Sequence, residues 1–329
     1  MVPQAEQKVV GIDVSKESLV ICHLVDGKAQ HMEAGNDKAG FKLLVKRCGA
    51  DSLYVMEATG VYYLQLAYYL VEQGTQVAVV NPVVIKRYIQ MRLGKGKSDR
   101  KDAQWIMRFG EHNQVDCWQP EEQVIVECRQ LEQVIEQLIK QKTMVINSLE
   151  ALDRKPVVSQ VAVKSLRQTL RLLEKQVREM EERLLSSLEK TYEREIKLLS
   201  SIPGIGRKTA AMLLLFYGGF QKVDNYRQLI AKAGLSPREF TSGTSVRGRV
   251  RITKMGGGLI RSKLFMCSFS AKKSNAACKA LYERLVGKGK NGKLALIAVC
   301  NKLLKQAFAI VKSGIPYQAD FANNYSCKA

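Results

Sequence analysis

Val9-Val10-Gly11-Ile12-Asp13-Val14-Ser15 has the pattern of a short buried strand with one acidic residue set into an apolar run. A buried strand rarely carries a carboxylate near its end unless something offsets the cost of desolvation, and a divalent cation is the usual partner. Strand-end carboxylates also cap turns, so Asp13 alone leaves both interpretations open.

Three further acids favour a metal site. Glu57 closes another apolar stretch, Ser52-Leu53-Tyr54-Val55-Met56. Asp99 and Asp102 lie three residues apart at a predicted helix start, where positions i and i+3 share one face. Four carboxylates and few histidines are typical of sites that bind hard cations through oxygen.

The segment 9–80 predicts strand, strand, strand, helix, strand, helix, strand. Asp26-Gly27 is a hairpin turn signal, and Asn81-Pro82 ends the last strand. Three antiparallel strands followed by strand and helix in alternation is the order of the α/β RNase H-like fold. In that fold the first and fourth strands are neighbours, which would bring Asp13 and Glu57 together.

Composition indicates the partner. The chain has 329 residues, 52 Lys and Arg against 31 Asp and Glu, and a net charge of +21. Such an excess favours a polyanionic partner, which we expect to be nucleic acid; the alternative is a basic protein without one. Eight scattered cysteines without a Cys-x-x-Cys pair, and three histidines, argue against zinc and against a disulfide framework. We expect reduced, mostly buried thiols.

The same composition bears on localisation. No apolar run approaches the roughly eighteen residues of a membrane span, and the polar segment 1–8 does not resemble a signal peptide. We therefore expect a cytoplasmic protein that has no membrane partner.

Basic residues gather beside the third and fourth carboxylates. The segment 86–101 contains a Gly-Lys loop, and Ser98 is placed to cap the helix that holds Asp102. A charge run is often only a solvated face, but its position favours a phosphate-guiding loop. The residues expected to contact phosphate are Lys95, Lys97 and Arg100.

We predict three domains, at 1–120, 121–199 and 200–329. The middle segment is long, charged and helical, with one break at Asp153-Arg154-Lys155-Pro156. Apolar residues from Leu166 to Leu184 step by three and four, as in a coiled-coil seam. A hairpin within one chain and dimerisation of two chains explain this seam equally well.

The last segment is mainly helical and combines a glycine turn with basic residues. Ile202-Pro203-Gly204-Ile205-Gly206 resembles a helix-hairpin-helix motif, whose amides bind a DNA phosphate, although such hairpins also serve as packing elements. Between Thr241 and Lys290 there are twelve Lys and Arg and one acid, and 294–311 is an apolar helix that must pack internally. The candidate phosphate contacts are Gly204, Gly206, Arg207, Lys208, Arg247, Arg249, Arg251, Lys254, Arg261 and Lys263.

The chemistry expected of four carboxylates is two-metal phosphodiester cleavage. Two Mg²⁺ or Mn²⁺ ions about 4 Å apart would clamp the attacking and leaving oxygens. Water is the usual nucleophile, but a serine beside glycine and arginine, in Thr241-Ser242-Gly243-Thr244-Ser245-Val246-Arg247-Gly248, is a second candidate. A serine in such a turn more often only bonds the backbone.

Several motifs together resemble one family. Gly11-Ile12-Asp13-Val14-Ser15-Lys16, Glu57-Ala58-Thr59-Gly60 and Lys97-Ser98-Asp99-Arg100-Lys101-Asp102-Ala103 resemble the RuvC-like half of the DEDD transposases of insertion sequence family one-ten, the bridge-RNA-guided recombinases. Ala233-Gly234-Leu235-Ser236-Pro237-Arg238 and the segment 242–248 resemble its C-terminal transposase half.

The resemblance implies residue roles. Asp13, Glu57, Asp99 and Asp102 would hold the metals, and Ser242 would form a covalent phosphoserine link to DNA. Ser242 directly precedes the first glycine of its turn, as the family serine does; Thr244 departs from the expected serine, and Ser245 is the fallback.

The resemblance also implies partners: donor and target double-stranded DNA, a structured non-coding bridge RNA, and further copies of the chain in a dimer or tetramer. Two alternatives remain. A Holliday-junction-type endonuclease would need the carboxylates but not Ser242, and a non-catalytic scaffold would need neither.

Overall fold

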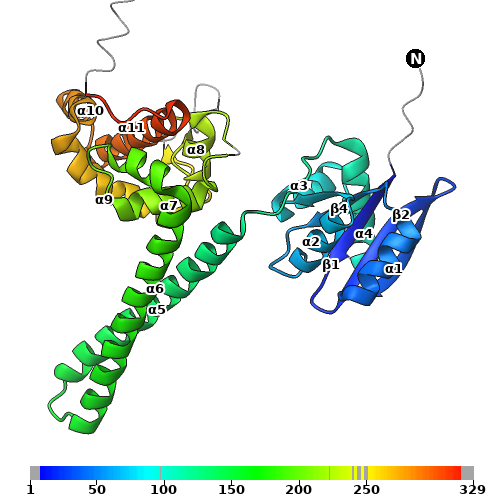
Figure 1. Cartoon of the computed structure of the whole chain (residues 1–329), viewed down its shortest axis with the longest axis horizontal. Coiled ribbons are helices and arrows are strands. Elements are labelled where there is room, and N and C mark those ends of the chain that lie inside the picture. Colours follow the sequence, from blue (N-terminus) through cyan, green and yellow to red (C-terminus); the bar gives the residue numbers. More distant parts are fainter. Residues whose placement is uncertain are drawn as a thin grey trace, which may run out of the picture. The chain divides into compact units, whose positions relative to one another are not determined.

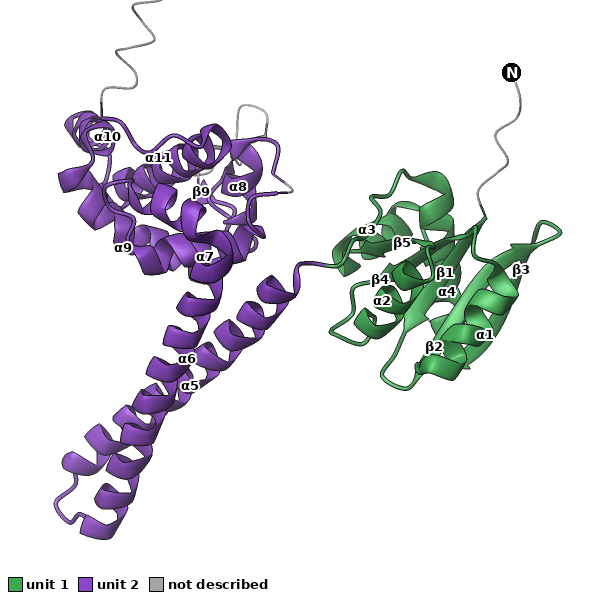
Figure 2. Cartoon of the chain, viewed as in Figure 1, with its two compact units in different colours: residues 1–120 green, residues 121–329 purple. Residues whose placement is uncertain are grey.

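The computed structural model describes residues 8–96, 98–221, 223–238, 241–242, 246–247 and 251–319. The chain divides into two compact units, residues 1–120 and 121–329 (Figure 2). The first boundary coincides with the end of the predicted N-terminal domain. The predicted segments 121–199 and 200–329 lie in one unit by their contacts, and their separate roles stay a prediction.

The N-terminal unit is an α/β domain around one sheet (Figure 1). Its elements are β1 (Val9–Val14), β2 (Ser18–Val25), β3 (Lys28–Gly35), α1 (Lys38–Cys48), β4 (Leu53–Glu57), α2 (Leu64–Glu72), β5 (Gln76–Val80), α3 (Pro82–Met91) and α4 (Asp99–His112). The strand order is β3-β2-β1-β4-β5, with β1 antiparallel to β2 and parallel to β4. From β1 to β5 this is the element order that the sequence predicts, whereas α3 was not predicted.

Local signals determine where these elements begin and turn. Asp26 and Gly27 adopt φ of 51° and 72°, as the two-residue turn between β2 and β3 requires. Asp37 caps α1, and Ser98 caps α4 by accepting a hydrogen bond from the Lys101 amide. The predicted turn and the predicted Ser98 cap are therefore confirmed.

Helices cover both faces of the sheet. Val10, Ile12 and Val14 of β1 share a buried cluster with residues of α1 and α2. On the opposite face, Leu53 and Val55 of β4 pack with residues of α3 and α4. Since side chains alternate along a strand, every second residue of β1 and β4 faces α4.

In the C-terminal unit, α5 (Gln123–Asp153) and α6 (Gln160–Ser200) pack along each other as a helical hairpin within one chain (Figure 1). Leu173, Val177 and Leu184 of the predicted seam are buried. Of the two interpretations of the seam, the structure shows the hairpin. An oligomer stays a prediction.

The remaining elements form a helical globular part. They are α7 (Arg207–Tyr217), α8 (Tyr226–Lys232), β6 (Pro237–Arg238), β7 (Thr241–Ser242), β8 (Val246–Arg247), β9 (Arg251–Ile252), α9 (Gly258–Ser274), α10 (Ala276–Gly287) and α11 (Gly292–Ser313). Ile125 and Cys128 of α5 and Leu188 of α6 belong to the same buried cluster as this part. The base of the hairpin is therefore continuous with the globular core.

Helix α11 is the one described helix with the length and apolar composition of a membrane span, with a mean hydropathy of 1.7 in its most apolar window. Its residues Val299, Leu303 and Ala307 are fully buried in the core, and it packs against α8, α9 and α10. The prediction that this apolar helix packs internally is confirmed.

Cysteines belong to the packing. Among the described residues Cys22, Cys48, Cys128, Cys278 and Cys300 are buried free thiols, as expected. Burial raises the pKa of Cys22, Cys48 and Cys278 to about 11 and that of Cys300 to about 12. These four thiols stay protonated at neutral pH and are poor nucleophiles.

Candidate functional site

Asp13 and Glu57 are brought together by strand pairing. In the parallel pairing of β1 with β4, Ile12 lies opposite Met56, and Asp13 and Glu57 are the next residues along the two strands. The carboxyl ends of parallel neighbours meet at the same edge of a sheet. Both residues are on the face that α4 covers, and both are half-buried.

Gly11 lets α4 approach this face. A Cβ built on Gly11 would lie 2.3 Å from the Ala103 carbonyl oxygen and 2.3 Å from the Met107 amide nitrogen. Only a glycine permits this backbone approach. Asp13, two residues further on, therefore points to the side of the sheet where α4 lies in direct contact with β1.

The direction of α4 places the other two carboxylates at the same edge. Ala103 contacts β1 at Gly11, whereas Gly110 at the other end of α4 contacts Val9 and Val55 near the strand starts. Helix α4 thus runs antiparallel to β1, with its N-terminus toward the carboxyl ends of β1 and β4. Asp99 and Asp102 lie in that first turn, Asp99 exposed and Asp102 half-buried.

The four carboxylates suit hard divalent cations by donor type, since they offer only oxygen ligands. Glu57 accepts a hydrogen bond from the Thr59 hydroxyl at 3.0 Å, which orients one of its oxygens. Across the part of the chain that the structure describes, no three acidic, histidine or cysteine side chains are grouped closely enough to hold a metal ion. The backbone collects the carboxylates at one edge, and the side chains do not form a ligand cluster as they lie.

The basic loop adjoins this edge. Lys95 is exposed, and its carbonyl oxygen accepts a hydrogen bond from Lys101 Nζ at 3.3 Å. Arg100 pairs with Glu33 of β3 at 3.4 Å, with both side chains largely exposed. Lys97 lies outside the described residues. Lys101 belongs to the basic segment but was not predicted as a site residue, and through this hydrogen bond it holds the loop against the start of α4.

The predicted phosphate-binding turn connects α6 to α7. Gly204 has φ of +103°, and a Cβ there would lie 2.7 Å from the Ala271 Cβ of α9, so this glycine is needed for packing. Gly206 caps α7 without a side chain and has open space around it. Arg207 pairs with Glu189 at 2.7 Å and Lys208 with Glu181 at 2.5 Å, both on α6.

Buried Asn275, the N-cap of α10, holds this turn in place. Its amide donates hydrogen bonds to the Gln306 side chain at 2.9 Å and to the Pro203 carbonyl at 3.4 Å. Its oxygen accepts from the Tyr317 hydroxyl at 3.2 Å, and the Tyr317 amide donates to Ser201 at 2.8 Å. Sequence reasoning missed this network, because an asparagine before a helix indicates only a cap.

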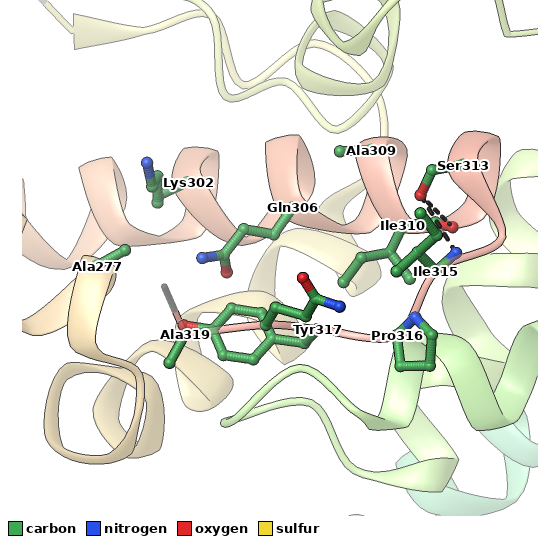
Figure 3. Close-up of a pocket in the computed structure, with 11 residues that line it drawn as sticks. Ala277, Lys302, Gln306, Ala309, Ile310, Ser313, Ile315, Pro316, Tyr317 and Ala319 are labelled. Atoms are coloured by element: carbon green, nitrogen blue, oxygen red, sulfur yellow. Dashed lines mark hydrogen bonds between the residues drawn. The ribbon is translucent and has the colours of Figure 1, made fainter. Parts of the chain in front are cut away.

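The segment from Ile315 to Ala319 supplies the outer wall of the network. It runs along α11, and a cavity of about 190 Å³ lies between them, lined by Gln306, Ile310 and Tyr317 among others (Figure 3). Tyr317 thereby connects the end of the described chain to the glycine turn.

The serine segment forms two short strands. Thr241–Ser242 pairs with Val246–Arg247 in an antiparallel ladder, with Ser242 opposite Val246. Ser245 and Arg249 lie outside the described residues. The structure therefore places the backbone of Ser242 in a small hairpin of the C-terminal unit.

The other predicted basic residues differ in their surroundings. Arg251 and Lys254 are exposed, and Lys263 is half-buried. Arg261 donates from Nη1 to the carbonyls of Ala233 and Gly256, at 2.9 and 3.1 Å. It therefore holds the β9–α9 connection against α8, a structural task that the sequence did not indicate, and its predicted phosphate contact stays a prediction.

Profiles of known transposase families match parts of both units. A profile of the DEDD transposases matches residues 10–153, and a profile described as Transposase IS116/IS110/IS902 family matches residues 196–283. DEDD membership points to dependence on a divalent metal.

Relatives extend the similarity along the chain. Pilin gene-inverting proteins from Moraxella bovis and Moraxella lacunata are each 28% identical over 322 residues, covering 94% of this chain and 97% of each relative. An uncharacterized protein of insertion element IS110 from Streptomyces coelicolor is 28% identical over 176 residues, covering 52% of this chain and 43% of that protein. The chain belongs to the IS110 family of transposases and is a DNA transposase and recombinase.

Proposed function

We propose that this enzyme cuts and rejoins donor and target DNA under the guidance of a structured non-coding bridge RNA. The N-terminal unit would be a RuvC-like, RNase H-like nuclease domain, and the turn 201–206 a helix-hairpin-helix. The observation that carries the proposal is the convergence of two parallel strand ends and the start of α4 at one edge, with all four predicted carboxylates there.

In this proposal Asp13, Glu57, Asp99 and Asp102 hold two Mg²⁺ or Mn²⁺ ions. When bound, these ions would supply charge neutralisation at the scissile phosphate. Lys95, Lys97 and Arg100 would position the DNA backbone beside them. Regular elements carry all four carboxylates, which favours a fixed ligand geometry.

Ser242 would act as the nucleophile. Its hydroxyl oxygen forms a bond to phosphorus, its proton passes to solvent or a nearby base, and the bond from phosphorus to the leaving DNA oxygen breaks. The resulting phosphoserine ester keeps the energy of the broken linkage, so the attack of another DNA end rejoins the strand without a further energy source. This is what a recombinase needs and a hydrolytic nuclease does not.

The test is one incubation of purified protein with Mg²⁺, the RNA encoded beside its gene, and DNA that carries donor and target sites. We expect a covalent protein–DNA adduct and recombinant product. Ser242→Ala should lose both, whereas Ser236→Ala, in the same unit outside the hairpin, should keep both. Cleavage without an adduct in the wild type would instead favour the Holliday-junction-type endonuclease, in which water attacks.

Two finer points follow from the test. If the adduct persists in Ser242→Ala and disappears in Ser245→Ala, the nucleophile is Ser245. If product forms equally well without RNA, the guidance is wrong while the chemistry stands.

A further inference from the structure

The α9–α10–α11 region of the C-terminal unit has basic residues without acidic partners. From Arg251 to Lys312 there are fourteen Lys and Arg and one acid, Glu283. Within the described residues, no carboxylate lies within 4.0 Å of the five basic residues that matter here. We call them the α10 basic surface: Lys272, Lys279, Lys288, Lys290 and Lys293.

This lack of pairing contrasts with the glycine turn. Arg207 and Lys208 are neutralised by Glu189 and Glu181 of α6. Helix α10 packs against α9 and α11 and buries only Cys278, so it is peripheral. Clustered charge without counter-charge on a peripheral helix raises the energy of the free protein, and a bound polyanion would relieve that repulsion.

The loop between α10 and α11 is open and firmly held. A Cβ at Gly287 or Gly289 would meet no atom within 4 Å, so a ligand can approach the backbone there. The Lys290 amide donates to the Leu285 carbonyl at 3.0 Å, and the Lys293 amide to the Asn291 side chain at 2.8 Å. Lys288, Lys290 and Lys293 are exposed on this fixed backbone.

Aromatic rings adjoin the same surface. Lys272 Nζ lies 4.7 Å from the ring centroid of Tyr282 and 5.6 Å from that of Phe269. A Cβ at Gly292 would lie 3.3 Å from the Tyr282 hydroxyl, so this ring connects Lys272 to the loop. Phe269 is 41% exposed on α9 and packs edge-on against Phe265. Phosphate-binding lysines beside exposed rings are typical of sites for unpaired nucleotides, whose bases stack on the rings.

We propose that the α10 basic surface, with Phe269 and Tyr282, binds a single-stranded segment of RNA. The inference rests on the proposed function, in which DNA enters as duplex and the guide is a structured RNA. Duplex DNA keeps its bases stacked inside, whereas the loops of a structured RNA present unpaired bases. None of these residues belongs to the proposed cleavage site.

The experiment measures binding of the full-length protein to three probes: a single-stranded RNA of mixed sequence, the same sequence as single-stranded DNA, and its DNA duplex. The variant is Lys288→Ala/Lys290→Ala/Lys293→Ala. The control is Lys38→Ala/Lys42→Ala/Lys46→Ala, which removes the same charge from exposed positions on α1 of the other unit.

We expect wild type to prefer the single-stranded RNA. In the loop variant the slope of log affinity against log salt should become shallower by about 2, for three lost phosphate contacts. Phe269→Ala should weaken RNA binding roughly fivefold to a hundredfold, the loss of one stacked base. The control triple variant should keep both the affinity and the slope, and all variants should keep their thermal midpoints.

The inference would be overturned by an unchanged slope in the loop variant, by an equal loss in the control, or by a loss confined to duplex DNA, which would assign the surface to DNA. A wild type without preference for single-stranded RNA would also overturn it. The proposed chemistry is tested in a separate experiment, which measures the Ser242 adduct on pre-cut or supercoiled DNA. The proposed chemistry and the proposed RNA-binding surface can therefore fail independently.

Discussion

The two units hold their candidate residues in different ways. In the N-terminal unit the carboxylates stand at the ends of β1 and β4 and in the first turn of the fourteen-residue helix α4. In the C-terminal unit Ser242 stands on a two-residue strand, paired with another of the same length. A short ladder opens at a small free-energy cost, whereas a five-stranded sheet does not.

This difference matches the two tasks in the proposal. Metal ligands need fixed positions, because the cations tolerate little variation in geometry. A nucleophile that attacks one strand and later releases it to another needs room to move. The comparison is therefore between a rigid carboxylate edge and a lightly held serine hairpin, and each prediction below tests one side of it.

The largest effect is expected at the carboxylate edge. Asp13→Asn, Glu57→Gln, Asp99→Asn and Asp102→Asn should each lower strand cleavage by at least about a thousandfold, since losing a metal ligand removes several kcal/mol of transition-state stabilisation. Chelation of divalent cations should do the same. Asp51→Asn, an exposed acid of the same unit, is the control. Near-normal turnover in two of the four variants would show that no shared site exists.

Mixing two inactive variants tests how the two sides combine. Asp13→Asn and Ser242→Ala each lack one half of the proposed site, and a mixed dimer whose sites draw on both chains would contain one intact pair. The adduct should then return to about half the wild-type level or less, because the other site carries both lesions. Proven subunit exchange without any adduct would indicate a site built within one chain.

Gly11→Ala should destabilise the N-terminal unit by roughly 3 kcal/mol, the cost of forcing α4 away from β1. Both tryptophans, Trp105 and Trp118, are in this unit, so the denaturant midpoint of their fluorescence reports it. Gly206→Ala is the counterpart in the other unit, where the added methyl meets open space. Because Gly206 is the N-cap of α7, where alanine is less favourable than glycine, stability should fall by no more than about 1 kcal/mol, and a fall in DNA affinity there would indicate a phosphate contact.

The sequence predicted the carboxylate edge of the N-terminal unit better than it predicted the arrangement of the C-terminal unit. Alternation and strand order were enough to place Asp13 beside Glu57, and Ser98 was enough to place the start of α4. The apolar seam of α6 did not indicate what packs against it, because a neighbouring helix and a second chain would bury the same residues. Asn275 could not be predicted as an organiser, since its partners Pro203 and Gln306 are 72 and 31 residues away.

The helical hairpin offers a smaller test. Leu173 is 6% exposed and its neighbour Leu172 is 56% exposed. Leu173→Asp should cost about 2 to 3 kcal/mol from the seam, through lost burial and a desolvated carboxylate, and lower the midpoint followed by far-ultraviolet circular dichroism. Leu172→Asp adds the same charge at an exposed position and should change the midpoint little. Equal effects in both variants would mean that the seam does not hold the hairpin.

The smallest effect concerns how the glycine turn is held. Tyr317→Phe removes one hydroxyl, which donates to the Asn275 oxygen at 3.2 Å, and leaves the ring in place. One such hydrogen bond contributes about 1 kcal/mol, so global stability should fall by no more than that. The Asn275 oxygen still accepts from Gln306 and from the Cys278 amide, so it keeps two donors.

If the network positions the turn, amide exchange of Ile205 should accelerate more than that of Leu214 in the middle of α7. Duplex DNA affinity should fall up to about fivefold with an unchanged salt slope, because no phosphate contact is lost. Tyr226→Phe, on α8 of the same unit, removes a hydroxyl outside this network and is the matched control. A uniform rise in exchange across α7 would mean that Tyr317 contributes only to overall stability. Of the candidate residues, only the carboxylates of the N-terminal unit would then be held in fixed positions.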